Sequence, residues 1–322
     1  MRNHGSFWLL YLLILVVIFI KVYPRTRRVV DDPVVAKEQL VWPNPLEKQA
    51  APVEKPRVRP TQGTVRPEYL QQAHKCMRDQ LATKVDRDVW EDFSKVVKNC
   101  TPYDEMRIKI YSNAERYNYF QRPARYDENP FLKNGCNLVT IGTSEDMQAE
   151  LSFSKDFPAC KFLGADPKPE KERQYVQVGK FVNQLITLNG TTAGNSTAIG
   201  IVPFFTEHLQ ESKIVDALWM DNEYEEYDLL PAILRTDPLF QAGYRICQLQ
   251  VEVHGHLEKP EIIAKWARFV RQLFDEGRYL PVHSMQSVHI RTFLFNFGDD
   301  ECFTRFVETF SFDSDEFYPI NE

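Results

Sequence analysis

The chain has 322 residues, of which 43% are hydrophobic and 26% charged, and its formal net charge is −6. These ordinary globular values exclude a collagen, a coiled coil and a wholly disordered chain. The acidic balance argues against nucleic acid as a partner, because binding to phosphates needs a basic face. The six cysteines form no Cys-x-x-Cys pair, so a structural zinc site is not expected.

The N-terminus predicts a membrane anchor. A tail of residues 1–6 precedes fourteen consecutive apolar residues, 7–20, and Lys21 can reach the interface so that the span extends over residues 7–23. A cleaved signal peptide is the alternative, but the small residues of a cleavage site do not follow the span. We therefore expect an uncleaved, single-pass signal anchor.

The orientation of this anchor depends on two opposing signals. Lys21, Arg25, Arg27 and Arg28 follow the span, and the positive-inside rule would keep them in the cytosol. Three N-x-S/T sequons and the even number of cysteines favour a lumenal domain instead; the sequons begin at Asn99, Asn189 and Asn195. We expect the lumenal orientation, so that the protein would be an ER or Golgi glycoprotein with its C-terminal domain in the lumen.

A proline-rich stem is predicted between the anchor and a globular domain. Residues 24–67 hold eight of the chain's 20 prolines and show no hydrophobic periodicity, which is typical of a semi-rigid spacer. The globular domain then covers residues 68–322. Its first segment, 69–99, predicts a helix with Leu81, Val85, Trp90, Phe93 and Val97 as apolar positions. Cys76 and Cys100 flank this segment, either as a disulfide or as two buried thiols.

The rest of the domain predicts an α/β fold. Short apolar runs indicate strands at 138–141, 162–165, 182–188, 197–205, 215–220, 244–253 and 288–297, with helices after the first run through 153, at 227–234 and at 261–276. The last helix is the clearest, because Pro260 precedes it and Gly277 can end it. Strands that alternate with helices predict a mostly parallel sheet with helices on both faces.

Two candidate ligand residues follow the first two predicted strands. Ligands of open α/β sheets bind at the carboxyl ends of the strands. Gly142 ends the first strand and would let the backbone approach a ligand, whereas Asp166 ends the second and could accept hydrogen bonds from a cofactor ribose. A turn glycine and a turn aspartate are the structural alternatives.

An acidic motif follows the strand at 215–220. Five carboxylates lie within residues 221–228, among them Asp221, Glu223 and Glu226. Acids in the first turn of a helix stabilise its dipole, which is one explanation. Carboxylates that lie close together can also raise one pKa to create a general base, or hold a divalent metal.

A histidine follows the strand at 244–253. Glu252 and His254 are two residues apart and therefore share one face of the strand or its end. His254 is a candidate proton acceptor, although a single histidine is more often structural.

These residues together resemble the FkbM-type methyltransferases. The run 218–230 resembles that family's Asp-x-Glu-Gly-x-Glu segment, and Val251-Glu252-Val253-His254 resembles its membrane-anchored nematode members. The resemblance covers about residues 100–310 and implies a Rossmann-like fold that binds S-adenosylmethionine and methylates an oxygen of an acceptor. It implies that Gly142, Asp166, Asp221 and Glu223 line the cofactor site, that His254 and Glu226 accept the proton, and that no metal is required.

Departures from the family pattern leave two alternatives open. Thr140 and Asp146 replace an Asp and a Gly of the first motif, and Tyr224 replaces the Gly of the acidic motif. A catalytically inactive, Rossmann-like binding protein is therefore one alternative. A lumenal, metal-dependent glycosyltransferase is the other, because Asp221-Asn222-Glu223 imitates a metal-binding Asp-x-Asp. The sequence does not identify the methyl acceptor.

Overall fold

The structure, a computed structural model, describes residues 67–103, 106–114, 116–122, 135–191, 197–209, 212–234, 238–255 and 259–307. The predicted tail and membrane anchor, almost all of the stem, and Asn195 lie outside these residues. Within the described ranges, no helix has the length and apolar character that crossing a membrane requires.

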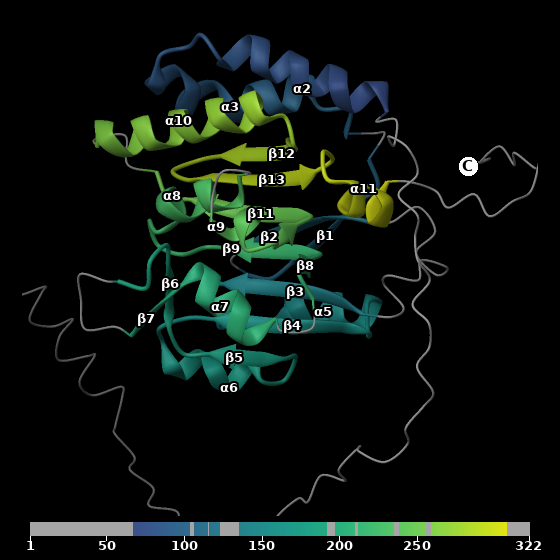
Figure 1. Ribbon diagram of the computed structural model, residues 1–322, viewed down its shortest axis with the longest axis vertical. Coiled ribbons are helices and arrows are strands. Elements are labelled where there is room, and N and C mark those ends of the chain that lie inside the picture. The colour runs from purple at the N-terminus through teal and green to yellow at the C-terminus, as the bar shows by residue number, and fades with distance from the viewer. Residues whose placement is uncertain are drawn as a thin grey trace, which may run out of the picture. The chain divides into compact units, whose positions relative to one another are not determined.

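A seven-stranded mixed sheet forms the centre of the domain, with the order β12-β13-β11-β9-β3-β4-β5 (Figure 1). Its strands are β3 (Cys136–Ile141), β4 (Cys160–Ala165), β5 (Lys180–Val182), β9 (Ala217–Met220), β11 (Gln248–Val253), β12 (Tyr279–Gln286) and β13 (Ile290–Asn296). Strand β13 is antiparallel to both of its neighbours, and the other neighbouring pairs are parallel. The sheet is therefore mostly parallel, as the sequence predicts.

Helices make the crossovers that parallel strands require. They are α5 (Gln148–Asp156) between β3 and β4; η3 (Pro169–Lys171) and α6 (Glu172–Tyr175) between β4 and β5; α8 (Glu226–Leu229), η4 (Leu230–Ile233) and α9 (Pro238–Gln241) between β9 and β11; and α10 (Pro260–Glu276) between β11 and β12. The chain moves one way across the sheet from β3 to β5 and the other way from β9 to β12. Since this reversal lies between β3 and β9, their carboxyl ends form the switch point at which such sheets bind ligands.

The central strands are covered on both faces. Every residue of β3, β9 and β11 is buried, which explains the apolar run of β9; β11 instead alternates polar and apolar residues, and its polar side chains are buried as well. At the β12 edge, α2 (Glu68–Leu81), α3 (Asp86–Cys100) and α10 pack together (Figure 1). The rings of Trp90 and Phe93 meet Trp266 edge to face, with centroids 6.2 and 4.9 Å away.

Two predicted elements are wrong in part. The segment 69–99, which was expected to be one helix, forms two helices. Val85, which was expected on the apolar face of that helix, is 65% exposed at the break between them. The strand expected over 197–205 is only β7 (Ala198–Gly200), which pairs with β6 (Leu185–Thr187) before α7 (Ile201–His208) begins. A short apolar run without alternation suits a buried helix as well as a buried strand, so the pattern alone did not separate the two.

Short strands near the sheet were merged or missed by the sequence prediction. Strands β8 (Ile214–Val215) and β10 (Arg245–Ile246) pair with each other, so the runs 215–220 and 244–253 are each divided by one residue, Asp216 and Cys247. The hairpin of β1 (Ile108–Ser112) and β2 (Tyr117–Gln121) was not predicted, nor was β12.

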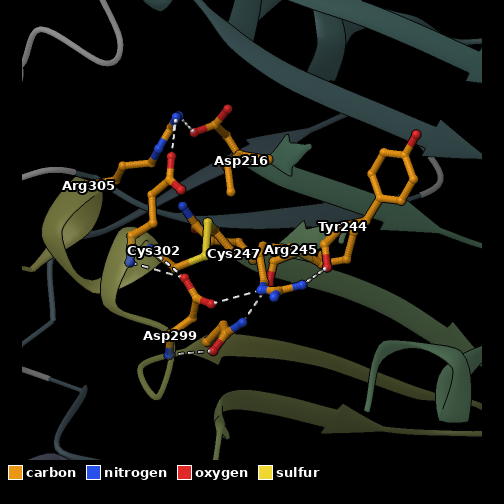
Figure 2. The surroundings of a disulfide bond; sticks show 12 residues. Asp216, Tyr244, Arg245, Cys247, Asp299, Cys302 and Arg305 are labelled. Atoms are coloured by element: carbon orange, nitrogen blue, oxygen red, sulfur yellow. Dashed lines mark hydrogen bonds and ion pairs between the residues drawn. A yellow bond between two sulfur atoms is a disulfide. The ribbon is translucent and has the colours of Figure 1, made fainter. Parts of the chain in front are cut away.

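All six cysteines form disulfides: Cys76–Cys100, Cys136–Cys160 and Cys247–Cys302. The third joins the start of β11 to α11 (Asp300–Phe306), where Arg305 pairs with Asp216 at 2.6 Å and Arg245 with Asp299 at 3.2 Å (Figure 2). Disulfides persist in oxidising compartments, so the three bonds indicate a secreted or lumenal domain. The sequon residues Asn99 and Asn189 are both exposed, as glycosylation would require.

Candidate functional site

Four neighbouring strands end at one edge of the sheet and bring the predicted site residues together. Asp166 follows β4, Gly142 follows β3, Asp221 follows β9 and His254 follows β11. Backbone hydrogen bonds continue the ladder past the strand ends, because the Gly142 N–H donates to the Ala165 carbonyl and the Asp221 N–H to the Ile141 carbonyl, each at 2.8 Å. The sequence therefore predicts this shared edge correctly.

The backbone of Gly142 packs closely against the backbone of Asp221. Its φ of +76° is left-handed, and a Cβ at this position would lie 1.6 Å from the Asp221 carbonyl oxygen. The Gly142 carbonyl in turn accepts a hydrogen bond from the guanidinium of Arg116 at 2.8 Å. The glycine is thus required by the packing of the two loops at the switch point, and its contact with a ligand stays a prediction.

Asp166 is buried, and its carboxylate already holds three donors. Oδ1 accepts the backbone N–H of Lys168 at 2.9 Å, whereas Oδ2 accepts the backbone N–H of Thr143 and the ammonium of Lys171, both at 3.1 Å. Lys171 also contacts the Thr143 carbonyl. The Thr143 hydroxyl oxygen is buried and lacks a hydrogen-bond partner among the described residues. A ribose would therefore compete with Lys171 for Asp166.

His254 and Glu226 form a buried pair at the other half of the edge. Their Nδ1 and Oε1 atoms are 2.6 Å apart, and the same Oε1 accepts the Asn222 N–H at 3.1 Å. The Tyr227 hydroxyl fixes the histidine backbone by donating to its carbonyl at 2.6 Å. Because a carboxylate accepts from Nδ1, this nitrogen carries the proton and Nε2 remains the acceptor in the neutral ring.

The free nitrogen of His254 faces two further carboxylates. Its Nε2 is 3.5 Å from Oδ1 of Asp221 and 3.7 Å from Oε2 of Glu223. Burial acts to lower the pKa of His254, but the hydrogen bond and charge of Glu226, with Asp221 and Glu223, outweigh it and raise that pKa. Burial raises the pKa of Asp221, against the attraction of Arg116, whose guanidinium is 3.4 Å away.

The acidic turn that carries these residues is strained. Glu223 and Tyr224 have φ values of 49° and 80°, and neither is a glycine. Such conformations cost free energy and occur most often at functional sites. The Asn222 amide anchors the turn by donating to the Ile186 carbonyl at 2.7 Å, while the Tyr224 ring lies 5.3 Å from the His254 ring. Glycine adopts this left-handed conformation without strain, whereas Tyr224 does not.

Among the described residues, two groups of side chains are close enough to suggest a metal, and hydrogen bonds already engage some of their ligand atoms. In one group, Glu252, His254 and His289, Nδ1 of His289 accepts the Gly255 N–H at 3.0 Å, so the other ring nitrogen carries the proton when the ring is neutral. In the other, Asp221, Glu226 and His254, the Glu226 Oε1 atom is engaged by the histidine. The absence of a resident metal stays a prediction.

Sequence reasoning missed the cationic side chains of the site. Arg116 comes from the turn between β1 and β2, Lys171 from η3, and Arg291 from β13, where it makes a two-point ion pair with Glu252 at 2.8 and 2.9 Å. The β-branched and aromatic residues of 108–112 and 117–120 were the available signal for the hairpin that carries Arg116. No local pattern marks Lys171 or Arg291.

The comparisons with known proteins assign no family to the chain. No family model matches the sequence, and no curated protein matches it. Solved structures with similar regions include the Methanococcus jannaschii fibrillarin pre-rRNA processing protein (11% identity, TM-score 0.33, 59% of this chain and 83% of that one). A second is the antibiotic-resistance methyltransferase Kmr (12% identity, TM-score 0.30, 58% of this chain and 100% of that one). A third is human methyltransferase 10 domain containing protein (11% identity, TM-score 0.31, 67% of this chain and 98% of that one). At these values the similarity assigns neither activity nor cofactor, and membership of the FkbM family stays a prediction.

Proposed function

We propose that this chain is an S-adenosylmethionine-dependent methyltransferase-like protein that transfers a methyl group to a hydroxyl oxygen of an acceptor. The observation that carries the proposal is the buried His254–Glu226 pair, whose free Nε2 lies beside Asp221 at the carboxyl edge of the sheet. A histidine held by a carboxylate in this way is a general base with a fixed orientation.

The strand order supports the same class of enzyme. Numbered along the chain, the seven strands of the sheet have the order 3-2-1-4-5-7-6, with the seventh antiparallel. Dinucleotide-binding sheets have the order 3-2-1-4-5-6. The first five positions agree with that order, so the switch point of this sheet suits a ligand that contains a nucleoside, as S-adenosylmethionine does.

The residues after β3 and β4 suit the cofactor, provided that Lys171 moves. Asp166 would accept the ribose hydroxyls, and the unpartnered Thr143 hydroxyl adds a polar group beside it. When bound, the cofactor would supply a methyl group that its sulfonium makes electrophilic. Asp221 and Glu223 would line the crevice between this site and the acceptor, and Gly142 would keep the two loops in close contact.

The task of the chain's own residues is then to align the acceptor and remove its proton. Alignment alone can lower a barrier by several kcal/mol. His254 would take the proton at Nε2 while Glu226 stabilises the resulting imidazolium through Nδ1. Since the pKa of His254 is raised, the fraction of neutral base and therefore the rate should increase with pH.

We further propose that the domain is tethered to an ER or Golgi membrane through residues 7–23, with the domain in the lumen. The three disulfides and the exposed sequon residues Asn99 and Asn189 support the lumenal side. Digestion of sealed microsomes with a protease tests this orientation: a protected domain with cleavable glycans supports it, and a digested one contradicts it.

Calorimetric titration of S-adenosylmethionine into the purified full chain tests the cofactor. We expect saturable binding that Asp166→Ala weakens at least about tenfold, or about 1.4 kcal/mol, because the ribose loses its acceptor. Asp228→Ala is the matched control, since this carboxylate is exposed and its ion pair among the described residues is with Lys265. Unchanged binding in folded Asp166→Ala would refute the ribose role.

His254→Gln separates catalysis from binding. This variant should bind the cofactor like the unmodified chain, yet transfer labelled methyl groups to a microsomal extract at a rate lower by about 10²–10⁴, the usual contribution of a general base. Equal transfer by the two proteins would remove His254 from the mechanism.

A non-catalytic binding protein is the second candidate. The ion pair of Lys171 with Asp166 favours it, because this lysine already occupies the predicted ribose acceptor. Failure of the folded chain to bind S-adenosylmethionine, even when Lys171→Met frees Asp166, would favour this candidate over the enzyme.

A further inference from the structure

A small cleft lies on the far side of Asp221 from Lys171, between the β1–β2 hairpin and the carboxyl ends of β9 and β11. It has room for about one water molecule. Its lining residues are Arg116, Tyr117, Asn118, Met220, Asp221, Gln250, Glu252 and Arg291. This acceptor cleft, as we call it below, is lined by Asp221, whose Oδ1 atom lies 3.5 Å from Nε2 of His254, and so it borders the predicted reaction site.

The walls of the acceptor cleft are polar but carry no net charge. Arg116 faces Asp221 at 3.4 Å, and Arg291 forms its two-point ion pair with Glu252. Each formal charge in the wall is therefore balanced by a neighbour. Such a wall gives no net attraction to a phosphate, a carboxylate or an amine, and its guanidinium and carboxylate groups still offer donors and acceptors to a neutral ligand.

One buried atom of the cleft wall lacks the partner that such a ligand would bring. Gln250 is 6% exposed, and its side-chain carbonyl oxygen has no hydrogen-bond donor among the described residues. An unpaired buried acceptor calls for an explanation, and the hydroxyl of a bound water or ligand is one. At the mouth, Tyr117 is 51% exposed and offers a flat apolar ring next to the polar wall.

We propose that the acceptor cleft receives a hydroxyl group of a neutral carbohydrate, which is then the methyl acceptor; this rests on the function proposed above. A sugar has adjacent hydroxyls that can both donate and accept hydrogen bonds, so they can bind the ion pairs of the cleft wall and the carbonyl oxygen of Gln250. A sugar also has an apolar ring face, which Tyr117 can cover. The space admits a single hydroxyl, so the ring remains at the mouth. An aliphatic lipid would satisfy none of the polar groups.

The acceptor O–H bond breaks and its proton passes to Asp221 and on to His254 Nε2, which faces Asp221 Oδ1. An O–CH₃ bond forms from the oxygen lone pair as the S–CH₃ bond breaks, and its electron pair leaves with sulfur as a neutral thioether.

Saturation-transfer NMR on the full chain tests the cleft without requiring turnover. The probes are methyl α-mannopyranoside, methyl β-galactopyranoside and methyl α-fucopyranoside, with glucose 6-phosphate and N-acetylthreonine amide as anionic and peptide comparators. We expect saturation of at least one glycoside and of neither comparator. Gln250→Met and Tyr117→Ala should each weaken glycoside binding at least tenfold, whereas Ile110→Ala, an exposed residue of β1 outside the cleft, should leave it unchanged.

Cofactor titrations on the same samples separate the two proposals. Cofactor binding without glycoside binding, or a preference for the threonine amide, overturns the carbohydrate subsite and leaves the methyltransferase intact. Glycoside binding without cofactor binding overturns the methyltransferase and with it the acceptor role of the cleft. Glycoside binding that is the same in Gln250→Met, Tyr117→Ala and the unmodified chain overturns the location, provided that near-UV circular dichroism shows both variants folded.

Discussion

Strands β9 and β11 carry charged side chains at both ends, and the two ends are built in different ways. At their amino ends, buried Asp216 accepts from Arg305 and from the Asn137 N–H, and the Cys247–Cys302 disulfide ties α11 over the pair (Figure 2). At their carboxyl ends, three carboxylates surround His254, one oxygen of Glu226 has no partner among the described residues, and two non-glycine residues are left-handed.

The contrast separates residues that hold the fold from residues arranged for chemistry. A buried charge that is paired and covalently clamped contributes to a fixed structure. Strained backbone and an unsatisfied buried oxygen cost stability. Such features, together with histidines of shifted pKa, concentrate at functional sites. The amino edge should therefore respond to mutation in its stability, and the carboxyl edge in its binding and chemistry.

The largest expected effect follows removal of the amino-edge disulfide. Replacing both Cys247 and Cys302 with Ala should lower the free energy of unfolding by about 4 kcal/mol, because a link between residues 55 apart restricts the unfolded chain. Urea unfolding measures the loss, and cofactor affinity of the folded variant should not change. A variant that keeps its stability but loses the cofactor would abolish the distinction between the edges.

Gly142→Ala tests the contact that joins the loops at the carboxyl edge. The new methyl group would overlap the Asp221 carbonyl, so we expect a loss of about 3 kcal/mol or more in unfolding free energy, together with loss of cofactor binding. Gly243→Ala is the matched control: it is also left-handed, at φ +89°, but a Cβ there meets nothing within 4 Å. It should cost only about 1 kcal/mol. Equal losses would show that backbone conformation, not overlap, decides.

Arg305→Met leaves Asp216 buried without its cation. Burial already raises the pKa of Asp216 against the attraction of Arg305, so the variant should lose about 3 kcal/mol in urea unfolding. Lys265→Met, which breaks a largely exposed pair with Asp228, should change stability by less than about 0.5 kcal/mol. Similar results for the two variants would contradict the structural role given to the amino edge.

A buried acid at the carboxyl edge should make stability depend on pH. Burial raises the pKa of Glu150 from the usual 4.5 to about 7. The folded state then keeps a proton that the unfolded state has lost, so stability should fall by about 3 kcal/mol as the pH rises from 4.5 to above 7. Glu150→Gln should remove this loss and unfold at higher urea than the unmodified chain at pH 8, with no difference at pH 4.5. A constant difference at both pH values would contradict the raised pKa.

Tyr224→Gly should have the smallest effect on stability, and the test lies in whether stability rises or falls. Because the backbone at Tyr224 is left-handed, glycine should relieve strain and stabilise the chain by up to about 1 kcal/mol. If Tyr224 is retained for its contact with His254, methyl transfer should fall while stability rises. A loss of stability would mean that the ring contacts outweigh the strain.

The sequence predicted the site best where each residue ends a strand. Gly142, Asp166, Asp221 and His254 all lie at the predicted edge, because the carboxyl ends of parallel strands must meet there. The family resemblance gave Glu226 and His254 a shared role as proton acceptors, but the sequence did not predict that their side chains would be in direct contact. Their contact depends on how the acidic turn folds back through two left-handed residues, which no local pattern in the sequence requires.

By itself, the sequence determined the α/β alternation, the buried strands β3, β9 and β11, and helix α10, which begins at Pro260 and ends at left-handed Gly277. These features follow from local patterning and from backbone preferences. The tertiary structure alone decided the reversal of chain direction between β3 and β9, the three cysteine pairs, the ion pair of Lys171 with Asp166 and the cleft behind Asp221. Most of these depend on contacts between residues far apart in the chain, and for such contacts local propensity carries no information.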